Sequence, residues 1–179
     1  MLERLLIAGQ GGQGIVSAGR LLATVAVDHV PHVTFFPAYG AEVRGGTSNC
    51  QVVLSSSDIA SPVCEQFTSM ILMNEASVDR FIAARLPDAR VIVSTAALGA
   101  VKDVSSVIAV DAPGIAGRLG NTRAANLVLV GAYLACRDVV PVADVEKAVA
   151  DRFAAKGAEV VDLNIEALRA GLESGAHAA

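Results

Sequence analysis

Residues 37–46, between two apolar runs, hold the residue types best suited to contact a ligand or another protein. They include three glycines, which allow the backbone to approach another surface closely. The guanidinium of Arg44 can hold a phosphate or carboxylate through two parallel hydrogen bonds. The alternative is a surface turn with a Glu42–Arg44 ion pair, which would contribute about 1 kcal/mol or less. Because stability alone is a weak reason for such a pair, we predict that this segment contacts a ligand or a partner.

A second glycine-rich segment, residues 9–14, follows an apolar strand and opens a helix. Gly9, Gly11 and Gly14 have the G-x-G-x-x-G spacing, in which backbone N–H groups and the positive helix end hold a phosphate or carboxylate. Binding of NAD also requires an acidic residue at the end of the second strand. Residues 34–37 are Thr, Phe, Phe and Pro, so dinucleotide binding is disfavoured. A turn that packs the helix closely on the sheet is the simpler interpretation, and a contact role remains open.

We therefore consider eleven residues as candidates for contact with a ligand or a subunit interface. They are Gly9, Gly11, Gly12, Gln13, Gly14, Tyr39, Gly40, Glu42, Arg44, Gly45 and Gly46. No residue is predicted to be catalytic, because the sequence has no nucleophile motif, no paired carboxylates in a loop and no close Cys–His pair. Thr47 and Ser48 have no base close in sequence, and we interpret them as turn and strand-edge hydroxyls.

The composition favours a protein that buries apolar surface against other subunits. Of its 179 residues 53% are hydrophobic and 18% charged, with a mean hydropathy of +0.52. The longest apolar stretch, residues 127–136, is shorter than the roughly 20 residues of a membrane-spanning helix, so we expect no membrane insertion. The net charge of −4 argues against nucleic acid as a partner. We expect one domain over residues 1–179 and no signal peptide.

The potential metal-binding side chains are scattered along the sequence. The cysteines and histidines are Cys50, Cys64, Cys136, His29, His32 and His177. Without a C-x-x-C pair, neither an iron–sulfur cluster nor a structural zinc ion is expected on this chain alone. Reduced thiols in a cytoplasmic protein are the expectation.

The pattern of apolar runs predicts a Rossmann-like α/β fold with an open, mostly parallel sheet and C-terminal helices. Strands are predicted over residues 5–8, 33–36, 50–54, 70–73, 91–94 and 107–110, and the first helix over about residues 15–28. No helix fits between the second and third strands, so the third is expected to run antiparallel or lie at an edge.

The predicted boundaries of the later elements depend on residues that break or cap them. Pro87 and Asp88 are expected to break the chain before a strand, and residues 111–114 to close one. The last helices are expected to begin near Asn121 or Thr122, at Pro141 and at Asn164, as caps or first-turn residues. In the first of these helices we expect Asn126 to satisfy neighbouring backbone groups.

Four motifs in order, residues 9–14, 39–46, 59–62 and 121–126, together resemble the gamma subunit or domain of 2-oxoacid:ferredoxin oxidoreductases. These enzymes act on pyruvate, 2-oxoglutarate, branched-chain and aryl 2-oxoacids. The resemblance implies oxidative decarboxylation of a 2-oxoacid, usually to an acyl-CoA, with electrons passed to ferredoxin or a related acceptor. It implies partner alpha, beta and ferredoxin-like subunits that carry thiamine diphosphate, Mg and iron–sulfur clusters. The two glycine-rich segments would then lie at a subunit interface, near where CoA enters.

Two other classes of protein remain as alternatives. One is an independent nucleotide-binding enzyme of the Rossmann type, which the missing acid at the second strand disfavours. The other is a non-catalytic adaptor of an unrelated complex, which the specific order of the four motifs disfavours.

Overall fold

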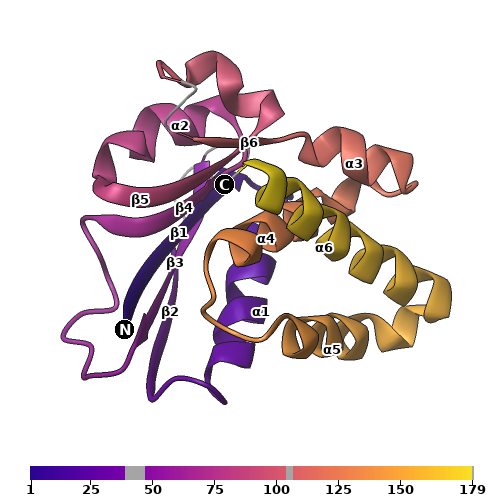
Figure 1. The fold of residues 1–179 in the computed structure, drawn as a ribbon, viewed down its shortest axis with the longest axis horizontal. Helices are drawn as coiled ribbons and strands as arrows, with labels where there is room; N and C mark the ends of the chain where they lie inside the picture. The colour runs from indigo at the N-terminus through magenta and orange to yellow at the C-terminus, as the bar shows by residue number, and fades with distance from the viewer. Residues whose placement is uncertain (39–46, 104–106, 179) are drawn as a thin grey trace.

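The computed structural model describes residues 1–38, 47–103 and 107–178, and six of its strands form one open sheet (Figure 1). The strand order is β2-β3-β1-β4-β5-β6. The strands are β1 (Leu2–Gln10), β2 (His32–Ala38), β3 (Thr47–Ser55), β4 (Phe67–Leu72), β5 (Arg85–Ser94) and β6 (Ile108–Val110). Strands β1, β4, β5 and β6 are parallel, whereas β3 runs antiparallel to both β1 and β2. The predicted antiparallel course of the third strand is therefore confirmed, but this strand lies inside the sheet and β2 occupies the edge.

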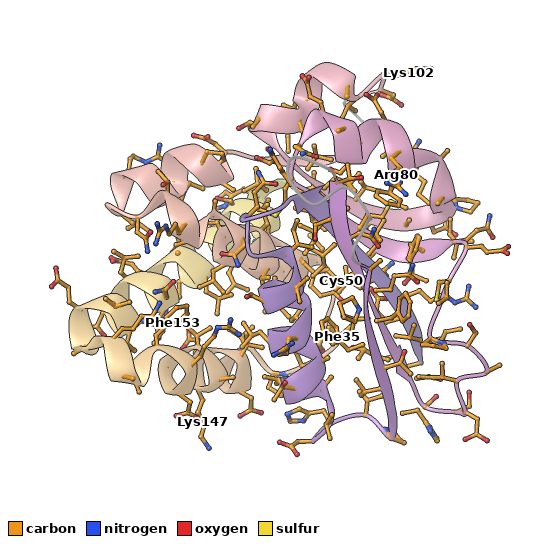
Figure 2. All side chains as sticks on the ribbon, turned by 180° about the vertical axis from the view of Figure 1, so that it is seen from behind. Phe35, Cys50, Arg80, Lys102, Lys147 and Phe153 are labelled. Carbon is orange, nitrogen blue, oxygen red and sulfur yellow. The ribbon has the colours of Figure 1, made fainter. Side chains whose placement is uncertain are left out.

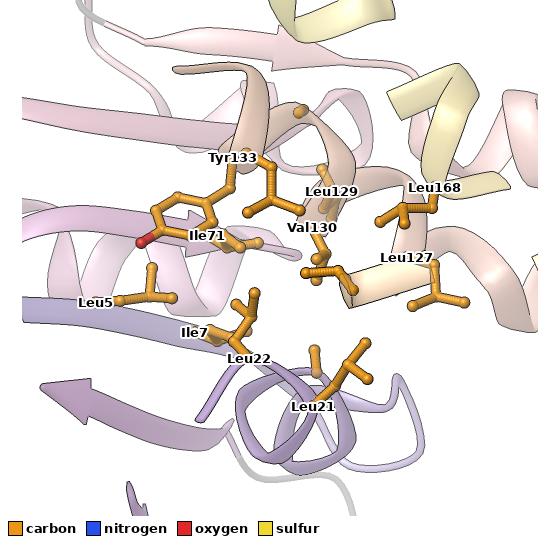
Figure 3. Close-up of a cluster of buried hydrophobic side chains, with 14 of the residues drawn as sticks. Leu5, Ile7, Leu21, Leu22, Ile71, Leu127, Leu129, Val130, Tyr133 and Leu168 are labelled. Atoms are coloured by element: carbon orange, nitrogen blue, oxygen red, sulfur yellow. The ribbon is translucent and has the colours of Figure 1, made fainter. Parts of the chain in front are cut away.

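Helices cover the two faces of the sheet unequally. The α-helices are α1 (Ile15–Ala26), α2 (Glu75–Phe81), α3 (Ala112–Arg118), α4 (Ala125–Cys136), α5 (Val142–Phe153) and α6 (Ala158–Ala178). Short 3-10 turns are η1 (Ile82–Ala84), η2 (Thr95–Ala100), η4 (Thr122–Ala124) and η5 (Ala154–Lys156). Helices α1, α4, α5 and α6 lie on one side of the sheet, where the larger apolar core forms (Figures 1 and 3). On the other side, α2 and η2 cover a smaller core.

Helix α4 is apolar on all sides, and residues 127–134 are all buried. It packs against β4 and β5 on one side and α6 on the other. The backbones of α4 and α6 meet at Gly131, Gly171 and Gly175, where a Cβ atom would contact backbone atoms of the other helix. Part of the apolar excess that we expected at subunit contacts is thus buried inside this layer.

Helix α1 also lies close to the sheet. A Cβ atom on Gly19 would collide with the Sγ of Cys50 and approach the ring of Phe35, both on the strands behind the helix (Figure 2). Burial raises the pKa of the Cys50 thiol to about 12, so this thiol stays protonated at neutral pH. Cys50 is therefore a packing residue and not a nucleophile.

Some predicted element boundaries are wrong, because a proline or an asparagine can lie inside a strand or helix as well as at its end. Pro87 does not break the chain but lies inside β5. The pairing of β5 with β4 is irregular there, because the register shifts between Phe67 and Ser69. A proline, which has no N–H to donate, is tolerated at such an irregularity. The prediction that residues 111–114 close a strand is confirmed, because β6 ends at Val110, but these residues also open helix α3, where Asp111 accepts a hydrogen bond from the Gly114 N–H. Asn164 does not cap a helix.

The side chains of Asn121 and Asn164, both predicted as possible helix caps, have different roles in the structure. Asn121, and not Thr122, caps the next helical segment through the N–H of Arg123. Asn164 lies buried within α6, where its side chain donates to the carbonyl of Val160, one turn earlier. An asparagine amide can therefore accept a backbone hydrogen bond at the start of a helix or donate one inside a helix.

Candidate functional site

The candidate site lies at the carboxyl ends of the neighbouring strands β1 and β4. The helix that follows β1 packs on one face of the sheet, and the helix that follows β4 packs on the other. Leu5 and Ile7 belong to the core under α1, and Leu6 and Ala8 to the core under α2. Helix α1 follows β1 on one face, and α2 follows β4 on the other. Ligands of open α/β sheets bind in the crevice at such a switch point, beyond the carboxyl ends of the strands. Residues 9–14 lie there.

Three of the four glycines in this segment have a local reason to be glycine. A Cβ on Gly9 would lie 2.5 Å from Gln13 Oε1 and 2.8 Å from Met73 Cβ. Gly12 and Gly14 have φ of +93° and +77°, which disfavour other residues. Gly11 has neither restriction: it is exposed, its φ is not positive, and a Cβ would meet no atom within 4 Å. The folded chain therefore leaves room at Gly11 for an approaching group.

Gln13 stabilises the turn from inside. Its Oε1 accepts a hydrogen bond from the backbone N–H of Gln10 at 2.6 Å. This bond gives Gln13 a structural function, although sequence reasoning left a contact role open.

A cleft of about 600 Å³ opens beside the turn, between α1 and the start of α4 on one side and α5, η5 and α6 on the other. It is lined by Gly12, Gly14, Ser17, Ala18, Leu21, Asn121, Arg123, Asn126, Leu127, Arg152, Phe153, Lys156, Val160 and Asn164. Three of these residues are cationic and none is acidic. The Arg152 Nη2 donates to the hydroxyl of Ser17 at 2.9 Å, and the Lys156 ammonium lies 5.4 Å from the centre of the Phe153 ring.

The N-terminus of α1 adds to the positive potential of this cleft. Helix α1 has no side-chain cap and no acidic residue in its first turn, so its first N–H groups are not neutralised by the helix's own side chains. A helix N-terminus together with Arg123, Arg152 and Lys156 makes a site suited to a phosphate or carboxylate.

Asn126 links two motifs that are far apart in sequence. Its Nδ2 donates to the carbonyl of Gly14 at 3.2 Å, while its Oδ1 accepts from the N–H of Leu127 at 3.0 Å. The prediction that this amide satisfies backbone groups is confirmed, and one of those groups belongs to the glycine turn.

The predicted residues Tyr39, Gly40, Glu42, Arg44, Gly45 and Gly46 lie outside the described residues, and their contact role stays a prediction. The strand that follows them is described. Thr47 pairs with Gln10 and Ser48 with Gly9, so β3 starts beside the glycine turn. Both hydroxyl residues lie on the strand, and Thr47 Oγ1 accepts from Arg80 Nη1 at 2.7 Å.

The candidate residues from the sequence did not include Arg123, Arg152, Lys156 or Asn164, although Arg123 lies in the motif 121–126. Basic residues near a helix C-terminus are common for electrostatic reasons alone, so Arg152 and Lys156 carried no distinct signal. In the described ranges, no three His, Cys, Asp or Glu side chains gather as a metal site, and the three cysteines are free. No helix in this part of the chain is both long and apolar enough to cross a membrane.

Fold and cleft together define an α/β domain of the Rossmann-like class, with a cationic cleft beside its first glycine turn. The sequence model of the pyruvate ferredoxin/flavodoxin oxidoreductase family matches residues 4–174, and the chain belongs to this family.

Among known proteins, the chain is 36% identical over 176 residues to ketoisovalerate oxidoreductase subunit VorA of Methanothermobacter thermautotrophicus. The match covers 95% of this chain but 36% of the relative, so the chain spans about a third of the VorA length. It is 25% identical to 2-oxoglutarate synthase subunit KorC of Archaeoglobus fulgidus, covering 94% of this chain and 86% of the relative.

Solved structures share the fold. The gamma subunit of a keto/oxoacid ferredoxin oxidoreductase from Geobacter sulfurreducens has a TM-score of 0.84 at 24% identity, over 99% of this chain and 98% of that one. The 2-oxoglutarate:ferredoxin oxidoreductase of Magnetococcus marinus has a TM-score of 0.85 at 23% identity, over 97% of this chain and 31% of that one. The predicted resemblance to gamma subunits is therefore confirmed.

Proposed function

We propose that the chain is the gamma-type subunit of a thiamine-diphosphate-dependent 2-oxoacid:acceptor oxidoreductase that forms an acyl-CoA. Within that complex we assign it part of the CoA site and no catalytic residue. The cleft carries this proposal, because three cations and an open glycine turn meet at a helix N-terminus in a chain of this family. The M. marinus enzyme of the same fold has coenzyme A bound, which supports the assignment.

The chain's own residues suit the phosphates of CoA, which has a diphosphate and a 3′-phosphate. Arg152 donates to the neutral Ser17 hydroxyl, and a phosphate oxygen is the stronger acceptor for a guanidinium. Arg123 and Lys156 supply two further charges, and Gly11 leaves the backbone open to close approach. In this proposal the chain binds and orients CoA, and a contact role for Tyr39 and Arg44 stays a prediction from the sequence.

The redox and decarboxylation chemistry is assigned to other subunits. The described residues offer no ligand set for a cluster or a metal ion. We therefore assign thiamine diphosphate, Mg and the iron–sulfur clusters to the alpha, beta and ferredoxin-like partners. An independent dinucleotide enzyme is the weaker candidate, because β2 runs to Ala38 without an acidic residue.

The isolated chain is expected to show no 2-oxoacid oxidation and no bound chromophore. Purified from its native cells, it should bring down larger subunits that contain thiamine diphosphate and iron. Native mass spectrometry with metal and thiamine assays measures this directly. Recovery of the chain only as a monomer or a homo-oligomer would contradict the proposed subunit role.

Replacement of Arg152 by glutamate is expected to raise the KM for CoA in the assembled enzyme about 10- to 100-fold, since a charged hydrogen bond contributes about 1.5–3 kcal/mol. The KM for the 2-oxoacid should stay unchanged. Lys147→Glu is the matched control, because Lys147 lies on the outer side of the same helix, α5, and does not line the cleft (Figure 2). Equal effects of the two variants on the KM for CoA would show that the cleft is not the CoA site.

A further inference from the structure

The cleft beside the glycine turn has an exposed cationic rim and a buried floor. The rim holds the side chains of Arg123, Arg152 and Lys156, all of which are exposed. The floor consists of the buried residues of the lining, which are Ala18, Leu21, Leu127 and Asn164. Phosphates require only the rim, so the floor indicates that the ligand also has an apolar part. Pockets for cofactors typically combine apolar walls with a few polar groups that fix the orientation of the ligand.

Asn164 is the polar side chain of this floor, and it is only 4% exposed. Its Nδ2 donates to the Val160 carbonyl at 2.7 Å, whereas no described residue donates to its Oδ1. Among the described side chains, Thr34 Oγ1 is the only fully enclosed nitrogen or oxygen without a partner, so Asn164 Oδ1 is open to the cleft. Buried acceptors in proteins are nearly always hydrogen-bonded. This oxygen therefore has the position of an acceptor for a donor that the chain itself does not supply.

The fold gives little reason for an asparagine at position 164. Ala167 and Leu168, the neighbouring buried residues of α6, are apolar, and leucine favours a helix more than asparagine does. The Val160 carbonyl lies one helical turn before Asn164 and is the regular partner of its backbone N–H. A second bond from the side chain to the same carbonyl adds little to the stability of the helix. The amide is better explained by a ligand in the cleft.

We propose that Asn164 Oδ1 accepts a hydrogen bond from the 6-amino group of the adenine of CoA, whose ring lies on the apolar floor. This inference rests on the proposed function and names the part of CoA that the cleft recognises. Adenine is flat and apolar on both faces, and it carries an N–H donor at its edge. One ribose joins it to the 3′-phosphate and the diphosphate, so a ring on the floor leaves these phosphates near the cations of the rim.

The amides of the pantetheine arm of CoA fit the floor less well. Each of them has an N–H donor, but each also has a carbonyl that requires a donor of its own when it is buried. Asn164 Nδ2 already bonds the Val160 carbonyl, and the other residues of the floor have apolar side chains. The floor therefore offers a free acceptor and no free side-chain donor, which favours adenine.

The test compares two nucleotides that differ at the proposed hydrogen bond. Isothermal titration of the assembled enzyme measures the Kd of adenosine 3′,5′-bisphosphate and of inosine 3′,5′-bisphosphate. Inosine has a carbonyl oxygen in place of the amino group, so two acceptors would face each other at Asn164. The adenosine compound should therefore bind about tenfold more tightly, as expected for the loss of one neutral hydrogen bond.

Variants of Asn164 should remove this preference. Asn164→Leu has a side chain of similar size without the acceptor, and its two Kd values should agree within about twofold. Asn164→Ser keeps a bond to the Val160 carbonyl but has a shorter side chain, so it should lose the preference while it disturbs α6 less. Arg152→Glu is the contrasting variant: it should weaken both nucleotides equally and leave their ratio unchanged. Circular dichroism of each variant verifies that it is folded.

Equal affinity of the wild-type enzyme for the two nucleotides would overturn this inference and leave the proposed phosphate site intact. A tenfold preference that persists in the folded Asn164 variants would also overturn it, because the base would then be recognised elsewhere. If the wild-type enzyme bound neither nucleotide, the inference would fail, and the KM for CoA of Arg152→Glu would decide the proposed function separately.

Discussion

Replacement of Glu3 by alanine is expected to lower the free energy of unfolding by about 3 kcal/mol. Glu3 is only 4% exposed, at the start of β1. Its carboxylate accepts hydrogen bonds from Thr68 Oγ1 at 2.9 Å and from the Tyr133 hydroxyl at 3.2 Å. Hydrogen bonds to a charged group contribute about 1.5–3 kcal/mol each, and removing the acceptor leaves the Tyr133 hydroxyl buried without a partner.

The nearby guanidinium contributes less to this effect. Arg137 Nε lies 3.9 Å from Glu3, but its side chain is partly exposed and also bonds Ser69 and the Thr68 carbonyl. Burial, followed by the Glu3 carboxylate, raises the pKa of Tyr133 well above its usual value, which keeps the hydroxyl a neutral donor. The network joins the start of β1 to β4 and to the end of α4.

Urea unfolding followed by circular dichroism measures the loss, and a thermal scan should show the midpoint about 6–12 °C lower. Tyr133→Phe should lose about 1 kcal/mol, since it removes one donor and leaves the carboxylate its other partners. Exposed Glu159 provides the control, and its alanine variant should change stability by less than about 0.5 kcal/mol. A loss below about 1 kcal/mol for Glu3→Ala would show that the network is unimportant for stability.

Gly171→Ala is expected to destabilise the fold by about 3 kcal/mol, although alanine favours a helix by about 1 kcal/mol over glycine. A Cβ at position 171 of α6 would fall on the carbonyl group of Val128 in α4. Backbone atoms in a packed helix cannot rotate away, so the two helices have to separate and lose contacts along both. Thermal unfolding of the purified chain measures the effect.

The control is a glycine in a helix with open space around it. A Cβ on Gly117 of α3 would meet no atom within 4 Å, and its φ is not positive. Gly117→Ala should therefore leave stability unchanged or raise it by up to about 1 kcal/mol. If the two alanine variants behaved alike, close contact between α4 and α6 would not be what requires glycine at position 171.

The order of the strands was predictable from the sequence, but helix α3 (Ala112–Arg118) and several element lengths were not. The apolar run 5–8 marks only the part of β1 that is buried on both faces, whereas antiparallel pairing with β3 extends the strand from Leu2 to Gln10. Asn164 shows why caps are hard to predict: an amide bonds a backbone carbonyl inside a helix as well as an N–H at its start.

Short-range patterns were sufficient to predict the strand–glycine turn–helix unit, the antiparallel third strand and the resemblance to the family. Turn geometry, helix periodicity and the minimum length of a crossover connection each depend on residues that are close in sequence. They can therefore be inferred from the sequence without the fold. The cationic cleft and the Glu3 network required the folded chain. Ser17 and Arg152 are 135 positions apart, and Glu3 and Tyr133 are 130 apart. Packing of α4 on the sheet and of α5 on α1 brings these side chains together, and no local spacing encodes such contacts.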